Sequence, residues 1–242
     1  MTVPRLAIIG TGKMGRLVAG VAEERGWPVV ATIGAEGNAG GRAITRDRLA
    51  GAQVAIEFTE PQSAADNVLA CVRAGCAVVC GTTGWSERRS EVARAVTQAG
   101  GALFWAANFA VGVNLFWLAA EQLAASIAAA SAGFSPHIVE THHAAKKDAP
   151  SGTALELQRR ASVAGAGGVP VTSVRVGSVP GTHELLFDAP YEQIRLEHVA
   201  RDRRVFAEGA LAAAEWIVGR SGVFGMADLL ARPASTSHTT PS

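Results

Sequence analysis

The amino-terminal part of the chain alternates short apolar runs with segments in which apolar residues recur at helical spacing. The first run is Leu6–Ile9, and the glycine-rich segment 10–15 follows it at once. Apolar side chains then recur at helical spacing over 17–22, and the next run, Val29–Ile33, has strand character. This order predicts a strand, a tight glycine turn, a helix and a second, parallel strand.

Two further runs of strand length, at 54–58 and 77–80, flank a segment of helical character at 64–74. Strands that alternate with helices predict an α/β fold of Rossmann type, in which a doubly wound parallel sheet carries helices on both faces. Ligands of such sheets bind beyond the carboxyl ends of the strands. We therefore look for candidate binding residues in the loops that follow the apolar runs.

The apolar stretch 103–120 is long enough to suggest a membrane helix, but Asn108, Gly112 and Asn114 interrupt it. Unpaired amides are costly in lipid, so we expect a buried strand, a loop and a core helix there. Beyond this stretch the pattern predicts a second, α+β domain with an open sheet in which antiparallel pairing prevails. The expected elements are a helix at 113–130, strands at 138–139 and 171–176, an alternating run around 194–197, helices at 205–218 and 226–230, and a disordered Ser/Thr/Pro-rich tail at 233–242.

Composition narrows the class of protein. The 242 residues, 48% of them hydrophobic and 27 of them glycine, suit one large or two ordinary globular domains. A formal net charge of +1 argues against a general binder of nucleic acid or membrane surfaces. The three cysteines lack paired C-x-x-C spacing, so we expect reduced core thiols and no metal site. No basic leader with an apolar core and a cleavage site precedes Gly10, which predicts a cytoplasmic protein.

The turn Gly10-Thr11-Gly12-Lys13-Met14-Gly15 has the spacing of a dinucleotide-binding motif. The first glycine permits the turn, the second lets the backbone approach a pyrophosphate, and the third lets helix and strand pack closely. The motif alone is weak, but its place between a strand and a helix supports NADH or NADPH binding. An acidic residue for the adenosine ribose is missing, since Gly34 follows the second strand. The choice of cofactor therefore stays open, with Lys13 and Arg42 as candidate partners for a 2′-phosphate.

Three loops follow strands at the edge of the sheet where ligands bind. These loops are Glu57-Phe58-Thr59, Gly81-Thr82-Thr83-Gly84 and Ala106-Ala107-Asn108-Phe109. They can line one nicotinamide site, or they can be ordinary polar turns. The spacing of apolar residues does not decide between the two.

The stretch 140–155 is the most informative part of the chain, because it gathers two histidines, two lysines and a Ser-Gly-Thr helix start. Such a cluster can bind an anion and move a proton, since histidine titrates near neutrality. Ser151 or Thr153 can cap the helix, whose free N–H groups suit a carboxylate. His142 and Lys146 stand four residues apart and can both meet one bound molecule. The alternative is an ordinary solvated basic loop.

Together these motifs resemble the family of 4-hydroxy-tetrahydrodipicolinate reductases, the dihydrodipicolinate reductases of the diaminopimelate route to lysine. The resemblance covers nearly the whole chain in order, and its most specific part is the histidine pair with the segment that ends in Asp-Ala-Pro-Ser-Gly-Thr. The matching motifs are Gly10-x-Gly-Lys-Met-Gly15, Glu57-Phe58-Thr59, Gly81-Thr-Thr-Gly84, Ala107-Asn108-Phe109-x-x-Gly-Val-Asn114, Glu140-x-His142-His143, Lys146-x-Asp-Ala-Pro-Ser-Gly-Thr153 and Val179-Pro-Gly-Thr-His183.

The resemblance implies a dinucleotide-binding domain at 1–110, completed by 206–232, and a substrate-binding domain at 111–205 that builds a homotetramer. It implies NAD(P)H-dependent reduction of 4-hydroxy-tetrahydrodipicolinate, a small-molecule dicarboxylate, to tetrahydrodipicolinate with loss of water. The cofactor would be NADH or NADPH. Neither nucleic acid nor a membrane is expected as a partner.

The resemblance also implies roles for single residues. His142 would donate and accept a proton, and Lys146 would be a proton donor. His143 and the backbone of Gly152 and Thr153 would hold the substrate carboxylates. These roles join the acid–base and anion-binding chemistry of the basic cluster in one site.

Further residues enter through the resemblance alone. Arg203 falls near the family's arginine between the domains, with Arg201 and Arg204 as close rivals. At Ala144-Ala145 and at Gly34 the chain differs from the pattern that many members of the family share. Substrate affinity and cofactor preference therefore stay open. The implied cofactor-binding residues are Gly10, Thr11, Gly12, Lys13, Met14, Gly15, Phe58, Gly81, Thr82, Thr83, Ala106, Ala107, Asn108 and Phe109.

Two other classes of protein share part of this pattern. Another Rossmann-type NAD(P)-dependent dehydrogenase, acting on amino acids or hydroxy acids, would keep the Gly10 turn but not the full constellation at 142–153. A non-catalytic NAD-sensing regulator would need no paired proton donors facing a carboxylate site. The constellation at 142–153 therefore discriminates between these classes and favours the reductase.

Overall fold

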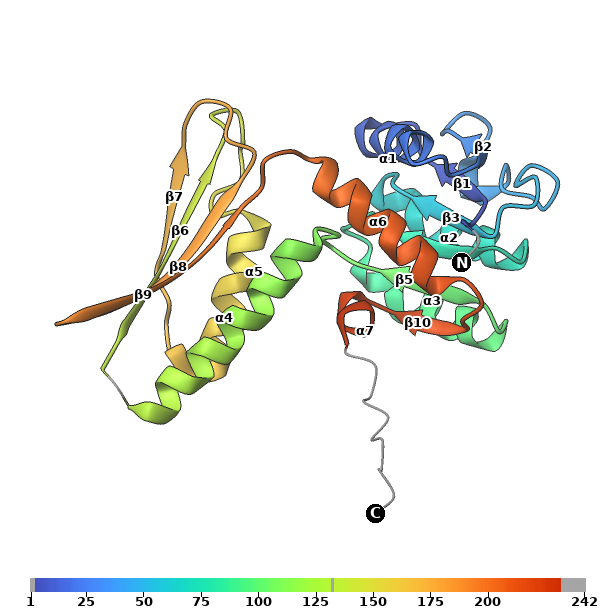
Figure 1. The fold of residues 1–242 in the computed structure, drawn as a ribbon. Coiled ribbons are helices and arrows are strands. Elements are labelled where there is room, and N and C mark those ends of the chain that lie inside the picture. Colours follow the sequence, from blue (N-terminus) through green and yellow to red (C-terminus); the bar gives the residue numbers. More distant parts are fainter. Residues whose placement is uncertain (1–2, 132, 232–242) are drawn as a thin grey trace, which may run out of the picture. The chain divides into compact units, whose positions relative to one another are not determined.

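The computed structural model describes residues 3–131 and 133–231, so the predicted tail at 233–242 lies outside the described residues. The chain folds into two compact units. Unit 1 holds the residues up to Ala107 and those from Ala210 onward, and unit 2 is Asn108–Gly209. Each unit has its own sheet and its own hydrophobic core (Figure 1).

Unit 1 is built on a six-stranded sheet in the order β10-β5-β4-β3-β1-β2, in which every neighbouring pair is parallel. All residues of β1 and β3 are buried, as expected when helices cover both faces of a parallel sheet. The predicted Rossmann-type architecture is confirmed. The strands are β1 (Leu6–Ile9), β2 (Val29–Ile33), β3 (Val54–Glu57), β4 (Ala77–Cys80), β5 (Ala102–Trp105) and β10 (Gly222–Phe224). The helices are α1 (Lys13–Glu24), α2 (Pro61–Arg73), α3 (Ser86–Gln98), α6 (Arg204–Ile217, which begins in unit 2) and α7 (Met226–Leu230), with a 3-10 turn at Ala39–Gly41.

Two elements of unit 1, α3 and β10, are not predicted by the hydrophobic pattern. Helix α3 buries only Val92 and Val96, so its sequence lacks the wide apolar stripe that marks a surface helix. Strand β10 has three residues, which is too short for a periodic pattern to register. The three cysteines of unit 1 are free and buried in the core, as predicted.

Unit 2 is built on a four-stranded sheet in the order β7-β6-β8-β9. Strands β6 and β7 are parallel, whereas the other two pairs are antiparallel, so the predicted prevalence of antiparallel pairing is confirmed. One face of this sheet shares a hydrophobic core with the helices of the unit. The elements are α4 (Val111–Ala130), β6 (Ser135–His142), α5 (Gly152–Ala161), a π-helical turn (Ser162–Ala166), β7 (Val171–Arg175), β8 (Thr182–Ala189) and β9 (Glu192–Val199).

Strand β6 is longer than its apolar pattern predicts. The pattern marks only 138–139, whereas the strand continues through His142. Ile138, Glu140 and His142 are buried in alternation, so they share the face that packs against the helices. On β8, His183 takes an inward position in the same way. Because polar residues occupy inward positions, the pattern of apolar residues predicts β6 only in part and does not predict β8.

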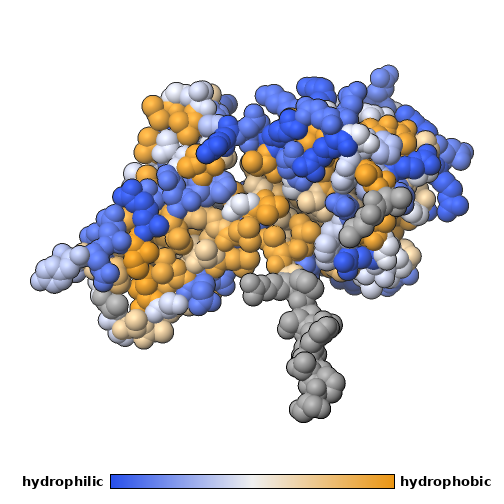
Figure 2. All heavy atoms as spheres, viewed as in Figure 1, coloured by the Kyte–Doolittle hydropathy of each residue, from blue (hydrophilic) through white to orange (hydrophobic). Residues whose placement is uncertain are grey.

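Helix α4 is long and apolar enough to span a membrane by length and composition. One side of the helix is nevertheless part of the core of unit 2, as predicted for a core helix. The other side carries Leu115 and Leu118, which are 50% and 45% exposed, and hydrophobic residues gather over this helix in Figure 2. The buried residues of α4 are Val113, Phe116, Trp117, Ala120 and Ala124.

Candidate active site

The glycine turn after β1 excludes side chains at two positions. Gly10 has a φ of +104°, and a Cβ there would lie 2.1 Å from the carbonyl oxygen of Phe58. A Cβ on Gly15 would lie 1.9 Å from the carbonyl oxygen of Gly10. Gly12 has open space around it and precedes α1 without a side-chain cap. The first N–H groups of α1 can therefore receive a phosphate, as the motif predicts.

The rest of the turn lies at the surface. Thr11 and Lys13 are exposed, and Met14 is half-buried. A Cβ on Gly34 would lie 3.2 Å from Thr11 Oγ1, so Gly34 faces the turn. Arg16, which the motif does not single out, donates a hydrogen bond to the carbonyl oxygen of Thr11 at 2.5 Å. The sequence points to Arg16 only through its position in the first turn of α1, beside the end of the helix that is predicted to bind phosphate.

A buried carboxylate joins the loops that follow β3 and β4. Glu57, the last residue of β3, is fully buried. It accepts hydrogen bonds from the hydroxyls of Thr59 and Thr82, the second at 2.7 Å. It also accepts from Asn67 Nδ2 at 3.3 Å and from Cys80 Sγ at 3.1 Å. The backbone N–H of Thr59 donates to Thr82 Oγ1 at 2.8 Å. Neutral donors thus satisfy this carboxylate and tie the two loops together.

Thr82 is also fixed through its backbone. Its carbonyl oxygen accepts hydrogen bonds from the indoles of Trp85 at 2.7 Å and Trp105 at 3.1 Å. A Cβ on Gly81 would lie 2.0 Å from the ring of Phe58, so that ring packs directly against the loop backbone. The structure therefore brings together the predicted cofactor-binding residues Phe58, Gly81 and Thr82.

The other predicted cofactor-binding residues differ in exposure. Thr83 and Ala107 are exposed, whereas Ala106 is buried. Asn108 and Phe109 belong to unit 2, and the side chain of Phe109 is buried.

Glu140 is the centre of a second buried network, in unit 2. Its Oε1 accepts hydrogen bonds from Arg175 Nη2 at 2.7 Å and from the backbone N–H of Ser151 at 3.2 Å. Its Oε2 is hydrogen-bonded to His142 Nδ1. Burial favours the neutral acid, but hydrogen bonds from Arg175, Ser173 and His142 lower the pKa of Glu140 to about 2. The carboxylate is therefore ionised at neutral pH.

His142, the predicted proton donor and acceptor, is 8% exposed. Burial lowers its pKa, the Glu140 carboxylate opposes that shift, and the charges of Lys146 and Arg175 reinforce it. A Cβ on Gly181 would lie 3.0 Å from His142 Nε2. The imidazole thus has a carboxylate at Nδ1 and a residue without a side chain beside Nε2.

A second buried histidine, His183, packs against His142. The two ring centroids are 5.1 Å apart, with an angle of 74° between the ring planes. Ser151 Oγ lies 3.2 Å from His183 Nε2. Burial, followed by the charge of His142, lowers the pKa of His183 to about 4. His183 is therefore neutral at physiological pH.

Ser151, and not Thr153, caps helix α5. Its hydroxyl accepts a hydrogen bond from the backbone N–H of Ala154 at 3.2 Å. Gly152 is exposed, with open space where a Cβ would stand. Thr153 Oγ1 accepts from Asn108 Nδ2 at 3.4 Å. Two residues from separate motifs, Asn108 and Thr153, therefore meet at the start of α5.

The remaining predicted site residues lie in loops of unit 2. The backbone N–H of Lys146 donates to the carbonyl oxygen of His143 at 3.0 Å. Lys146 Nζ donates to both carboxylate oxygens of Asp148, at 2.8 and 2.7 Å, and this contact lowers the pKa of Asp148. Arg203 is exposed, and its guanidinium lies 6.0 Å from the centre of the Phe206 ring.

The motifs assign no role to Glu140, Arg175 or His183, which surround His142. One signal was available, because Glu140 and His142 are two residues apart and therefore share a strand face. No such signal marks Arg175, which stands opposite His142 only through the register of β6 and β7. Burial of an acidic residue beside a histidine is the feature that singles out this network.

Family comparison covers both units. Residues 4–109 match the family model described as dihydrodipicolinate reductase, N-terminus, and residues 112–230 match the model described as dihydrodipicolinate reductase, C-terminus. Two curated relatives are named 4-hydroxy-tetrahydrodipicolinate reductase. The protein from Rhodopseudomonas palustris (strain BisB5) is 35% identical over 95% of this chain and 98% of its own. The protein from Acidiphilium cryptum (strain JF-5) is 38% identical over 93% and 97%.

A solved structure gives a likeness of fold. It is dipicolinate-bound dihydrodipicolinate reductase from Paenisporosarcina sp. TG-14, which matches with a TM-score of 0.80 at 20% sequence identity. The match covers 95% of this chain and 100% of that one, so the likeness extends over both units.

Proposed function

The chain belongs to the dihydrodipicolinate reductase family, and we propose that it reduces 4-hydroxy-tetrahydrodipicolinate to tetrahydrodipicolinate with NADH or NADPH and loss of water. The family match confirms the resemblance that the motifs carry. The observation that supports the activity most directly is the network around Glu140. There a titratable histidine, a guanidinium and the start of α5 share one buried carboxylate.

The reaction needs a hydride and a proton at different atoms of one conjugated dicarboxylate. The nicotinamide supplies the hydride. The negative charge that then develops along the conjugated imine is quenched by a proton at the other end, and nearby cations such as Lys146 stabilise it. The dipicolinate bound to the relative from Paenisporosarcina sp. TG-14 supports a planar dicarboxylate as the ligand class.

Unit 2 is proposed to bind this substrate. His142 donates and accepts the proton, and Lys146 is a second proton donor. His143 and the backbone of Gly152 and Thr153 hold carboxylates, for which the free N–H groups of α5 are suited. Arg203 contributes a further cation to the substrate.

Unit 1 is proposed to bind the dinucleotide. Its glycine turn fits a pyrophosphate, because open space surrounds Gly12 while Gly10 and Gly15 hold the turn against its neighbours. We expect the loops tied by Glu57 to hold the nicotinamide, and Asn108 and Phe109 to be further cofactor contacts. Either NADH or NADPH suits the turn. The full set of proposed contacts is Gly10, Thr11, Gly12, Lys13, Met14, Gly15, Phe58, Gly81, Thr82, Thr83, Ala106, Ala107, Asn108 and Phe109.

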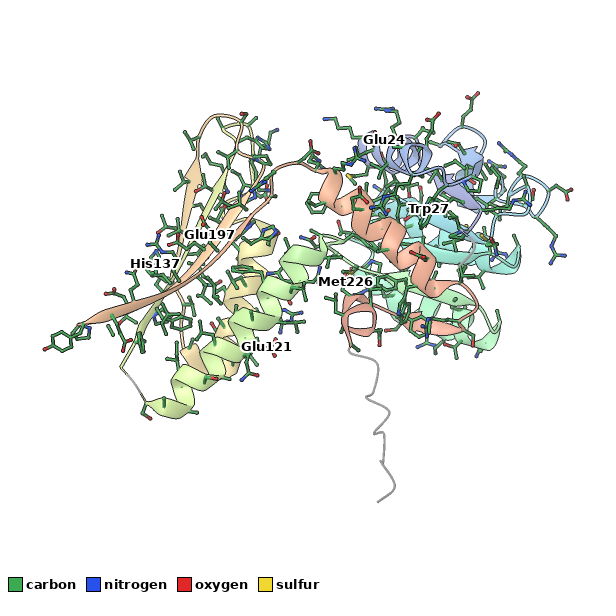
Figure 3. All side chains as sticks on the ribbon, in the orientation of Figure 1. Glu24, Trp27, Glu121, His137, Glu197 and Met226 are labelled. Carbon is green, nitrogen blue, oxygen red and sulfur yellow. The ribbon has the colours of Figure 1, made fainter. Side chains whose placement is uncertain are left out.

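Assembly into a cytoplasmic homotetramer is part of the proposal. The sheet of unit 2 turns one face away from α4 and α5, and this outer face includes His137 and Glu197 (Figure 3). Val174 and Val199 stand on the same face and are 36% and 53% exposed. We propose that subunits meet there. Sedimentation equilibrium would contradict this assembly if the protein remained a monomer at the concentrations used for activity.

The activity can be tested by following oxidation of NADH and NADPH with freshly made 4-hydroxy-tetrahydrodipicolinate. We expect turnover that needs both the dicarboxylate and the reduced cofactor. Amino-acid and hydroxy-acid dehydrogenases would instead work on oxo acids with or without ammonia, so these substrates serve as controls. Oxidation with oxo acids but not with the cyclic dicarboxylate would refute the proposal.

A further inference from the structure

The two oxygens of Glu140 have different kinds of partner. Oε1 faces two groups that can only donate, the guanidinium of Arg175 and the backbone N–H of Ser151. Oε2 faces His142 Nδ1, a nitrogen that donates or accepts according to its tautomer. Because Glu140 is ionised and can only accept, Nδ1 must carry a hydrogen for this contact to be a hydrogen bond. The contact therefore selects one tautomer of neutral His142.

We propose that Glu140 is the positioning residue that keeps a proton on His142 Nδ1 and leaves Nε2 as the atom that exchanges a proton with the substrate. This inference rests on the proposed function, because it assigns the reacting atom within that site. Gly181 is consistent with the assignment, because it has no side chain that would crowd Nε2. Arg175 and Ser151 hold the carboxylate in place and thereby orient the imidazole.

The proton balance follows from this arrangement. In the imidazolium form His142 has hydrogens on both nitrogens, and the Glu140 carboxylate stabilises the positive charge. As hydride reaches the conjugated substrate, the Nε2–H bond breaks and its proton joins the other end of the conjugated system. Neutral His142 with Nδ1–H remains, and a solvent proton at Nε2 restores the imidazolium.

The charged and titratable groups around His142 come from four elements. They are Glu140 on β6, Lys146 in the loop after β6, Arg175 on β7 and His183 on β8. Lys146 and Arg175 disfavour the imidazolium, and His183 is neutral at physiological pH. Glu140 is the anion that opposes them, so its removal must lower the pKa of His142.

The first test is a measurement on the unaltered protein. Nitrogen-15 NMR of histidine-labelled protein distinguishes the two neutral tautomers, and the His142 signals are assigned by their loss in the His142→Gln variant. We expect neutral His142 to carry its hydrogen on Nδ1. A hydrogen on Nε2 would overturn the inference, whatever the behaviour of any Glu140 variant.

The second test is Glu140→Gln, which keeps the size of the side chain. Arg175 and Ser151 require an oxygen at the Oε1 position, so the amide NH₂ must face His142 and donate to Nδ1. The neutral tautomer should therefore invert, with its hydrogen on Nε2. The inverted tautomer and a lower pKa of His142 should reduce kcat at neutral pH about 10²-fold, the scale of general acid–base catalysis.

The pH profile separates positioning from a merely structural role. The falling limb of kcat with rising pH should move to lower pH in Glu140→Gln, while KM for cofactor and substrate should change by less than about threefold. An unchanged pH profile, or a rise in KM without a loss of kcat, would overturn the inference. The matched control is Glu121→Gln on α4, an exposed site labelled in Figure 3, which should leave kcat and its pH profile unchanged.

The two proposals fail in different ways. If the unaltered protein did not reduce 4-hydroxy-tetrahydrodipicolinate, the proposed function would be wrong even with the hydrogen of His142 on Nδ1. If the unaltered protein were active and Glu140→Gln kept the original tautomer, only the positioning role would be wrong.

Discussion

The two units each bury one glutamate completely, and the partners of the two carboxylates differ. Glu57 in unit 1 accepts from hydroxyl, amide and thiol donors, all of them neutral. Glu140 in unit 2 accepts from Arg175 and from a backbone N–H, and it contacts an imidazole. The same residue type therefore stands in two electrostatic environments, at the last residue of β3 and two residues before the end of β6.

The partners decide what each carboxylate can do. Burial first, and then the charge of Glu57, raises the pKa of the Cys80 thiol, so Cys80 keeps its hydrogen and remains a donor. Donors that keep their hydrogens fix geometry, which is what the loops after β3 and β4 need. Histidine is the side chain that ordinarily titrates nearest neutrality, and burial lowers the pKa of His142, so the Glu140 network can pass a proton on. Unit 1 uses its carboxylate to hold loops, and unit 2 uses its own to control a proton.

Removing the imidazole from the Glu140 network should give the largest effect. We expect His142→Gln to lower kcat by about 10²- to 10⁴-fold, with a smaller change in KM, because the proton is delivered only in the transition state. Steady-state kinetics with reduced cofactor would measure this. Glu121→Gln at the exposed site on α4 is the control and should keep kcat. Full activity of His142→Gln would show that His142 is only structural.

Removing the other carboxylate should affect folding more than proton transfer. Glu57→Ala leaves the hydroxyls of Thr59 and Thr82 and the amide of Asn67 without their buried acceptor. We expect a loss of about 3 kcal/mol in the free energy of unfolding. Urea unfolding followed by tryptophan fluorescence would measure it.

Glu57→Gln sharpens the contrast with Glu140→Gln. It keeps the size and one acceptor of the side chain, so it should cost about 1–2 kcal/mol and leave the pH profile of kcat in place. Glu23→Ala, an exposed change on α1, should cost less than about 0.5 kcal/mol. A shifted pH profile of kcat in Glu57→Gln would show that Glu57 also affects proton transfer, which contradicts the proposed difference between the two networks.

The buried histidine of unit 2 should make stability depend on pH. The pKa of His183 is lowered from 6.5 to about 4, so the folded state binds fewer protons than the unfolded state between these values. Its contribution to stability is therefore complete above pH 6.5 and is lost as the pH falls towards 4. The loss should be on the order of 3 kcal/mol.

In the His183→Gln variant the side chain at position 183 cannot titrate. The free energy of unfolding of this variant should therefore fall less steeply between pH 7 and pH 4.5 than that of the unaltered protein. Burial also lowers the pKa of His142 and of His198, so part of the acid sensitivity should remain. Urea midpoints across this range would measure the slope for both proteins. Equal slopes would show that His183 is accommodated in the folded state in either charge form.

The smallest expected effect concerns the cofactor in unit 1. Asp at position 34 would stand beside Thr11, where it can bond the adenosine ribose and repel a 2′-phosphate. We expect Gly34→Asp to shift the ratio of kcat/KM towards NADH by about tenfold, or 1.4 kcal/mol. Gly34→Ala separates the tight contact of a Cβ with Thr11 from the charge. If the ratio did not change in Gly34→Asp, the ribose would be held by other residues.

How far the sequence predicts the structure depends on where its polar residues stand. The strands of unit 1 are predicted because runs such as Leu6–Ile9 are apolar throughout, as a sheet covered on both faces requires. In unit 2 the pattern captures two residues of β6 and does not predict β8, since Glu140, His142 and His183 occupy inward positions. The polar residues that build the candidate site are therefore the same residues that interrupt the apolar pattern of its strands.

The candidate site shows the same limit. Residue type and spacing point to His142 and Lys146, and the Ser-Gly-Thr segment predicts the helix start at Gly152. Arg175 could not be predicted as a partner of Glu140, because 35 residues separate them and only the pairing of β6 with β7 brings them together. A contact that depends on strand register cannot be predicted from the pattern of neighbouring residues along the chain.

The inward positions of Glu140, His142 and His183 also bear on how this enzyme can change over evolutionary time. These side chains occupy places in the sheet where Ile138 and Leu185 show that aliphatic residues fit. Filling all three with apolar residues of similar volume, and replacing their partner Arg175 in the same way, would remove the buried polar groups without leaving a charge unpaired and would tend to stabilise unit 2. Selection for heat resistance alone would therefore drift towards an inert variant of this fold. A library screened for thermal tolerance has to be screened for turnover as well, at these three positions above all.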